Sequence, residues 1–150
     1  EGGIKGAALP MAMNRKPVYT RGLMLLGDAA GLVSPFNGEG ISSAMESAEL
    51  AADAVLDARS RGFGTPQAER ALQGYACHLE ELLGGYYRLG IVFANLIGNP
   101  TVMKICTKYG LPRKNLMKLV SKLLAGLYDT RDGDLSDKII TGLSRMVPAE

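Results

Sequence analysis

The chain lacks the cysteine and histidine patterns that hold metal ions or build a disulfide framework. Its two cysteines, Cys77 and Cys106, lie far apart, no CxxC occurs, and the single histidine, His78, has no partner at metal-ligand spacing. These absences exclude the common zinc and dithiol motifs. Both cysteines fall in helical patterns, so we expect free, buried thiols in a reducing compartment and no metal site.

Long apolar runs and a strong net charge are also missing. No apolar run reaches the roughly 18 residues of a membrane-spanning helix. Seventeen Lys and Arg residues nearly balance fifteen Asp and Glu residues, and the net charge of +2 gives no large uniform field, so we expect no nucleic-acid partner. The balance is uneven: residues 1–98 carry 8 basic and 10 acidic residues, whereas residues 99–150 carry 9 and 5.

The most informative segment that is present runs from Gly22 to Ile41. The unbroken apolar run Leu23–Leu26 predicts a strand that is buried on both faces. Asp28 follows this run, where a carboxylate can accept hydrogen bonds from sugar-like hydroxyls. Glycines then precede a predicted helix N-terminus, which suits an electron-rich or anionic ligand group. The alternative is an ordinary strand, turn and helix that bind nothing.

The hydrophobic pattern and the positions of glycine, proline and capping residues predict short strands followed by helices. The strands are expected over 4–13 and 17–27. Helices are expected over 41–61, 66–83, 86–97, 100–110, 112–127 and 135–147, with a linker at 62–66, an interruption at Gly84-Gly85 and a loop at 130–134. Apolar residues of the first helix fall on one stripe, whose small residues would let the helix pack close to the sheet or the flavin: Ile41, Ala44, Met45, Ala48, Ala52, Val55 and Leu56. The last helix is expected to carry Leu135, Ile139, Leu143 and Met146 on one face.

A family resemblance rests on the motif Gly27-Asp28-Ala29-Ala30-Gly31, followed by Pro35 and Gly38-Glu39-Gly40-Ile41. This motif resembles the second FAD-binding motif of the aromatic-hydroxylase-like flavoprotein superfamily. Within that superfamily, the wording SPFNGEGISSAMESAELAAD is most similar to the geranylgeranyl reductase family, and the C-terminal helices resemble its actinobacterial members that saturate the prenyl tail of menaquinone. The resemblance implies an FAD-dependent oxidoreductase that saturates carbon–carbon double bonds of an isoprenoid chain, either a geranylgeranyl lipid or a menaquinone tail.

The resemblance also implies a fold, namely an α+β fragment of an α/β flavoprotein. Short N-terminal strands and an FAD-binding strand-loop-helix would precede an all-helical C-terminal region. Residues 1–61 would be the C-terminal portion of the FAD-binding domain, with the second FAD motif, and residues 62–150 the helical region. Such flavoproteins carry a GxGxxG motif that holds the pyrophosphate, and this chain has none. We therefore expect the C-terminal part of a longer enzyme, inactive as a fragment.

The resemblance assigns cofactor-binding roles within the motif. Asp28 would bind the ribityl chain of FAD, and Pro35 would lie beside the isoalloxazine ring. Backbone N–H groups from Gly38 to Ile41 would face the flavin pyrimidine and stabilise the charge that develops on reduction. The full set of expected cofactor-binding residues is Gly27, Asp28, Ala29, Pro35, Gly38, Glu39, Gly40 and Ile41. Many hydroxylases carry a basic residue where this chain has Glu39, which agrees with the reductase branch.

Substrate and partner expectations follow from the helical region. Tyr86, Tyr87 and Phe93 would line a prenyl channel, and the alternative is core packing with exposed polar tips. Lys114, Lys118 and Lys122 recur every four residues opposite a broad apolar stripe, which is typical either of a helix on an anionic membrane or of a surface helix of a soluble domain. The expected partners are a prenyl lipid and a reduced electron donor (NAD(P)H, ferredoxin or another). The expected location is the cytoplasm, with peripheral attachment to the inner face of the cell membrane.

Two other functions fit the same segments, and no catalytic acid stands out in the chain. One alternative is a flavin-dependent aromatic monooxygenase with the same fold and cofactor. The other is a non-enzymatic helical membrane-association module that retains a vestigial motif. Fold alone does not separate the two enzymes.

Overall fold

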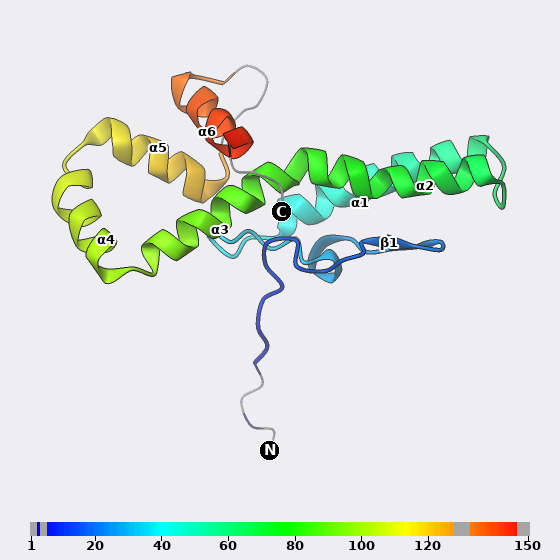
Figure 1. Cartoon of the computed structure of the whole chain (residues 1–150), viewed down its shortest axis with the longest axis horizontal. Coiled ribbons are helices and arrows are strands. Elements are labelled where there is room, and N and C mark those ends of the chain that lie inside the picture. The colour runs from blue at the N-terminus through cyan, green and yellow to red at the C-terminus, as the bar shows by residue number, and fades with distance from the viewer. Residues whose placement is uncertain (1–2, 4–5, 128–132, 147–150) are drawn as a thin grey trace. The chain divides into compact units, whose positions relative to one another are not determined.

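The computed structural model describes residues 3, 6–127 and 133–146, and in this part the chain is mostly helical (Figure 1). A hairpin of two short strands, β1 (Tyr19–Thr20) and β2 (Leu23–Met24), leads into a 3₁₀ turn, η1 (Gly27–Ala30). The α-helices are α1 (Ile41–Ser60), α2 (Pro66–Leu79), α3 (Gly85–Ile97), α4 (Pro100–Ile105), α5 (Lys114–Ala125) and α6 (Leu135–Met146). Two π-helical segments, η2 (Glu80–Gly84) and η3 (Cys106–Gly110), follow α2 and α4.

Contacts divide the chain into two compact units. The first unit contains residues 1–34 and 38–82, and the second contains residues 35–37 and 83–150. The sequence predicts a boundary between residues 61 and 62, whereas the structure has it between residues 82 and 83. The boundary is later because α2 packs along α1 and so belongs to the first unit. The predicted division by function stays a prediction.

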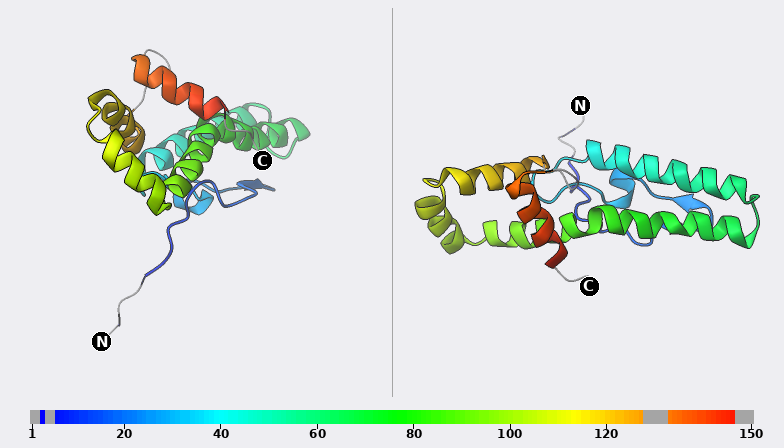
Figure 2. Two further views of the ribbon diagram at one scale, coloured as in Figure 1. Left: turned by 60° about the vertical axis from the view of Figure 1, so that its left-hand side comes forward. Right: turned by 90° about the horizontal axis from the view of Figure 1, so that it is seen from above.

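The first unit is built around the pair α1 and α2, which lie side by side (Figure 2). α1 buries only small residues on the packed face: Ser43, Ser47, Ala51, Ala54 and Ala58. The stripe of α1 that the sequence predicts to pack close to the sheet or the flavin is not covered by the described chain, since Ile41, Met45 and Leu56 are 75%, 70% and 60% exposed. Small side chains allow the two helix backbones to approach closely, so the larger apolar residues of α1 remain at the surface.

The predicted strands are much shorter than expected. Only Tyr19 pairs with Met24 and Thr20 with Leu23, while Met11 makes a single parallel bridge to Val33. Burial on both faces is also wrong, because Leu23 is 58% exposed. Among the described residues β2 has β1 as its only strand partner, and an isolated two-stranded hairpin is only marginally stable, so the pairing stays short.

Local end signals place the helices close to their predicted bounds. The Thr65 hydroxyl accepts a hydrogen bond from the Ala68 N–H at the start of α2, and the Asn99 side chain caps α4 in the same way. Gly126 ends α5 in the left-handed conformation. The predicted interruption at Gly84-Gly85 is the end of the π-helical segment η2. Most of the predicted loop at 130–134, like the last predicted helical residue, Val147, lies outside the described residues.

The second unit has its own hydrophobic core. Leu89, Leu123 and Ile140 are buried at its centre, and four partly buried residues pack against them: Phe36, Tyr86, Phe93 and Leu119. The predicted apolar face of α6 is not buried, because Leu135 and Met146 are 76% and 79% exposed. α6 packs instead through the neighbouring face that contains Ile140.

Two sequence-level expectations outside the core have different outcomes. Cys77 and Cys106 are both exposed, so the expectation of buried thiols is wrong. Each cysteine lies on the outer side of its helix, where the apolar character of a thiol does not contribute to packing.

In the described part of the chain, no single helix is long and apolar enough to cross a membrane; only the bent pair Pro66–Ile97 and Pro100–Gly110 reaches that length and composition together.

Candidate functional site

The turn η1 presents Asp28 beside the N-terminus of α1. Asp28 is exposed, whereas Gly27 and Ala30 on either side of the turn are buried. A Cβ atom added to Gly40 would stand 3.1 Å from Asp28 Oδ1. The carboxylate therefore lies against the bare backbone that precedes α1, and any side chain at position 40 would crowd it.

A buried polar network holds this turn in place. The N–H of Gly27 donates to Ser47 Oγ at 3.1 Å, and the Ser47 hydroxyl donates to the carbonyl of Ala44 at 3.0 Å. The hydroxyl of Tyr75, which is fully buried, donates to the carbonyl of Leu25 at 2.7 Å. Burial raises the pKa of Tyr75, and its hydrogen bond with Ser47 partly opposes that shift. Helices α1 and α2 thus fix the backbone on both sides of Leu26.

The loop that follows η1 is closed by its own backbone. Gly31 has φ of +75° and ends the turn, and its N–H donates to the carbonyl of Asp28 at 3.0 Å. The N–H of Ser34 donates to the carbonyl of Glu39 at 2.7 Å, and the N–H of Gly38 donates back to Ser34 at 2.9 Å. The Gly38 N–H is therefore engaged within the loop and does not face outward.

Glu39 occupies part of the positive end of α1. Its carboxylate accepts hydrogen bonds from the N–H of Ser42 at 2.8 Å and from the Ser42 hydroxyl at 2.9 Å. These bonds, assisted by the N–H of Ile41, lower the pKa of Glu39. The N–H groups that the sequence offers to a ligand are thus partly satisfied by a side chain of the same motif.

The structure places the remaining predicted site residues in the second unit. Pro35 packs over the backbone of Gly90 in α3, and the ring of Phe36 lies 4.8 Å from that of Tyr86 and 5.6 Å from that of Phe93. Pro35 therefore lies against Gly90, and its neighbour Phe36 joins an aromatic cluster, while Asp28 and Gly38 to Ile41 belong to the first unit.

Tyr86, Tyr87 and Phe93 have packing roles in this structure. Tyr87 is 1% exposed, and the Tyr86 hydroxyl donates to the carbonyl of Leu123 at 3.3 Å. Phe93 is partly buried against Phe36. These contacts correspond to the core-packing alternative, and the lining of a prenyl channel stays a prediction.

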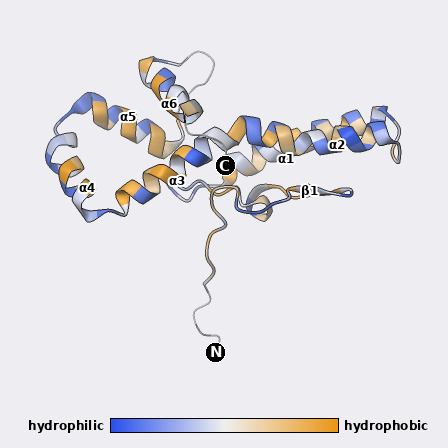
Figure 3. Cartoon of the chain, in the orientation of Figure 1, coloured by the Kyte–Doolittle hydropathy of each residue, from blue (hydrophilic) through white to orange (hydrophobic). Residues whose placement is uncertain are grey.

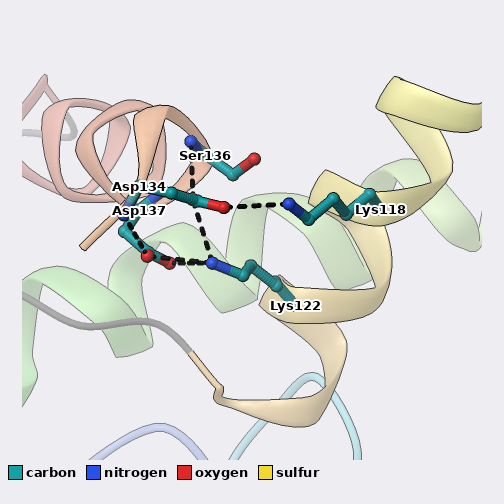
Figure 4. Close-up of polar contacts among 5 residues, drawn as sticks. All are labelled: Lys118, Lys122, Asp134, Ser136 and Asp137. Atoms are coloured by element: carbon teal, nitrogen blue, oxygen red, sulfur yellow. Dashed lines mark hydrogen bonds and ion pairs between the residues drawn. The ribbon is translucent and has the colours of Figure 1, made fainter.

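The lysine face of α5 is largely paired with α6 (Figure 4). Lys122 Nζ lies 2.9 Å from carboxylate oxygens of both Asp134 and Asp137, and Lys118 Nζ lies 2.9 Å from Asp134. Asp134 also accepts the N–H of Ser136 at 3.0 Å and so caps α6. Two of the three lysines that the sequence offers to a membrane therefore join α5 to α6.

Comparison with known proteins identifies relatives with a common theme. Digeranylgeranylglycerophospholipid reductase 3 of Methanosphaera stadtmanae is 31% identical over 116 residues, which is 71% of this chain and 28% of the relative. Menaquinone reductase of Mycobacterium tuberculosis is 45% identical over 75 residues, 49% of this chain and 18% of the relative. Menaquinone reductase of Mycolicibacterium smegmatis is 26% identical over 132 residues, 85% of this chain and 29% of the relative.

These relatives make the chain similar, over its matched part, to reductases of the geranylgeranyl reductase family. It spans less than a third of the length of these curated relatives. No family model matches the chain, and no solved structure matches it significantly.

The segment from Gly27 to Ile41 has features that fit a flavin. An exposed carboxylate can accept hydrogen bonds from the hydroxyls of a ribityl chain. The space beside Gly40, which a Cβ would fill, keeps that carboxylate accessible next to a helix N-terminus. The residues present therefore fit an FAD group at Asp28, with Glu39 as a neighbouring negative charge.

Sequence reasoning missed the two side chains that support the turn carrying Asp28. Ser47 and Tyr75 lie 20 and 50 residues from their partners Gly27 and Leu25. Ser47 stands among small residues in a helix, and its spacing gives no sign of a partner in the preceding turn. A buried tyrosine usually needs a hydrogen-bond partner for its hydroxyl, but the sequence does not say which.

Proposed function

We propose that this chain is part of an FAD-dependent reductase that saturates carbon–carbon double bonds of an isoprenoid chain, a geranylgeranyl lipid or a menaquinone tail. The observation that carries the proposal is the exposed carboxylate of Asp28 beside the bare backbone of Gly40 at the start of α1. The names of the relatives, a digeranylgeranylglycerophospholipid reductase and a menaquinone reductase, support the substrate class.

In this proposal Asp28 holds the ribityl hydroxyls of FAD and so fixes the position of the cofactor. Ser47 and Tyr75 keep the turn that carries Asp28 from moving, because their hydrogen bonds are buried. When bound and reduced, FAD would supply hydride chemistry toward an alkene. An unactivated double bond offers little charge to bind, so the apolar walls of the protein would act by orientation and exclusion of water.

Glu39 has a specific electrostatic role in the proposal. Its carboxylate is turned onto Ser42, where the helix N-terminus compensates its charge. This arrangement keeps a negative charge from pointing outward beside Asp28. Ser42 thus positions Glu39 so that an electron-rich ligand group can approach the remaining backbone of the motif.

The proposed partners are a prenyl lipid and a reduced electron donor, either NAD(P)H, ferredoxin or another reductant. We further propose a cytoplasmic location with peripheral contact to the inner face of the cell membrane. The support is chemical, because a substrate with a long prenyl chain resides in a bilayer.

The cofactor assignment is tested by replacing the carboxylate in the complete protein that carries this chain. Asp28→Ala is expected to weaken FAD binding by about 10- to 100-fold, the effect of losing hydrogen bonds to a charged group. The matched control is Asp53→Ala, which removes an exposed carboxylate from α1 rather than from the turn η1. It should leave FAD affinity unchanged. Equal FAD affinity in Asp28→Ala and the wild type would show that Asp28 does not anchor the cofactor.

The reaction is tested on the same complete protein under anaerobic conditions. After chemical reduction, menaquinone and a geranylgeranyl lipid are added separately, and mass spectrometry measures the gain of two hydrogens. A gain on either lipid supports the reductase and selects its substrate. No gain, with oxygen-dependent NAD(P)H oxidation in the presence of an aromatic compound, would replace the proposal with a monooxygenase.

A further inference from the structure

The segment formed by α4 and η3, Pro100–Gly110, is a helix that buries almost none of its side chains; we name it the elbow helix. α4 buries none of its residues, and in η3 only Gly110 is buried. A short helix normally gains its stability from packing of an apolar face, and in the described structure the elbow helix packs only at its two ends, against α3 and beside Leu116. Among the described residues, most of the surface of this helix is therefore uncovered.

The elbow helix nevertheless has an apolar face. Val102, Ile105, Cys106 and Tyr109 recur at three- and four-residue spacing and so share one side. Ile105 is 54% and Tyr109 57% exposed. Helix α3 bends by 85° into the elbow helix, and Figure 3 shows hydrophobic residues on both sides of this bend. The exposed apolar surface thus includes the end of α3, where Leu96 and Ile97 are 47% and 43% exposed.

The charge around this face has a single sign. Residues 99–127 contain six Lys and Arg residues and no Asp or Glu. Lys118 and Lys122 are paired with α6, but Lys104, Arg113 and Lys114 are exposed and make no ion pair with any residue that the structure describes. Lys108, four residues after Lys104, lies over the ring of Tyr109, with Nζ 5.2 Å from the centroid. Lys104 and Lys108, four residues apart, share one side of the helix.

We propose that the elbow helix docks onto the surface of an anionic lipid membrane. It would lie in the plane of the interface, with its apolar face among the lipid chains and Lys104 and Lys108 directed to headgroup phosphates. A second copy of the chain is a poorer occupant, since it would bring two surfaces of the same positive charge together. The inference deepens the proposed function by naming the surface that meets the membrane, and its biological purpose rests on that function.

The two cysteines supply a position-specific test. Cys106 lies on the apolar face of the elbow helix, and Cys77 lies on α2, and both are exposed. A polarity-sensitive fluorophore is attached to Cys106 in a Cys77→Ser chain, and to Cys77 in a Cys106→Ser chain. Vesicles of phosphatidylglycerol and phosphatidylcholine should shift the emission of the Cys106 label to the blue and leave the Cys77 label unchanged. Equal responses at both positions, or no response at Cys106, would overturn the proposal.

Charge variants test the lipid class. Lys104→Gln with Lys108→Gln should weaken partitioning onto the anionic vesicles by about 30-fold, from two cations each acting near the surface. The matched control, Arg59→Gln with Arg70→Gln, removes two exposed positive charges from α1 and α2 and should leave partitioning within about twofold. Binding should also be lost on vesicles of phosphatidylcholine alone and at high salt.

Three further results would overturn the assignment of the elbow helix to an anionic membrane. The first is an equal loss in both double variants, and the second is equal binding to neutral and anionic vesicles. The third is a concentration-dependent dimer without lipid that Ile105→Ser abolishes, since a second copy would then cover the helix. None of these measurements involves reduction of a prenyl lipid, so a failed reductase assay and a failed docking assay are distinguishable.

Discussion

Ser47→Ala tests whether the buried network holds the turn that carries Asp28. The substitution removes the oxygen that accepts the Gly27 N–H at 3.1 Å, at a site where Ser47 is fully buried. A buried N–H left without an acceptor costs about 1–3 kcal/mol. Alanine is the better helix former by up to roughly 0.5 kcal/mol, which offsets part of that cost. We expect the free energy of unfolding to fall by about 1.5 kcal/mol.

Ser60→Ala is the matched control on the same helix. Both serines donate to the carbonyl three residues earlier, Ser47 to Ala44 at 3.0 Å and Ser60 to Asp57 at 2.8 Å. Ser60 is exposed, so its loss should change stability by less than about 0.5 kcal/mol. The two variants therefore differ chiefly in the buried acceptor.

Urea unfolding followed by far-UV circular dichroism measures both variants against the wild type. Tyr75→Phe completes a double-mutant cycle, because the Tyr75 hydroxyl bonds to Ser47 and to the carbonyl of Leu25. The combined loss should differ from the sum of the single losses by about 0.5 kcal/mol or more. If Ser47→Ala were as stable as Ser60→Ala, the network would not hold the turn and the reasoning would be refuted.

Two further predictions concern the turn and the ion pairs. Gly31→Ala should destabilise the chain by at least about 1 kcal/mol more than Gly64→Ala in urea unfolding: both glycines have positive φ, but only a Cβ at Gly31 meets a neighbour, Asn14 Oδ1 at 2.5 Å. Equal losses would contradict it. Lys122 and then Lys118 hold the pKa of Asp134 well below its usual range. Ionised Asp134 therefore stabilises the fold above about pH 4, and this contribution is lost as pH falls. Asp134→Asn should reduce the acid-dependent drop in the urea midpoint, and an unchanged drop would count against this pair.

Helix ends could be predicted from the sequence because their signals are local. Thr65 before Pro66, Asn99 before Pro100 and Gly126 each act within a few residues of the end that they define. The π-helical end at Gly84 was visible as a break in the pattern, although its type was not. Such signals need no knowledge of the rest of the fold.

The buried face of α1 could not be predicted from hydrophobicity. The stripe with Ile41 and Met45 has the larger apolar side chains, yet the structure buries the stripe with Ser47 and Ala51. Close packing of α1 against α2 favours small residues on the buried face. The sequence of α1 alone does not show which of its faces α2 contacts. The strand lengths failed for a related reason, since pairing depends on neighbours that the local pattern does not contain.

The candidate site was predictable as a motif but not as a network. The order of Asp28, Gly38 and Gly40 indicated a carboxylate near a helix start, and the structure places Asp28 against Gly40. The motif gave no sign that the Gly38 N–H closes the loop or that Glu39 turns onto Ser42. Those bonds depend on the path of the backbone, which the residue types leave open.

The three residues 35–37 belong to the second unit although the chain on both sides of them belongs to the first. A single cut between residues 82 and 83 therefore separates Phe36 from the ring of Tyr86, its partner at 4.8 Å. Because of this exchange, neither fragment produced by that cut corresponds to one complete compact unit. A study that divides this protein should therefore combine the two fragments, residues 1–82 and 83–150. The Phe36→Ala variant of the first fragment then shows whether the second fragment needs the Phe36 ring.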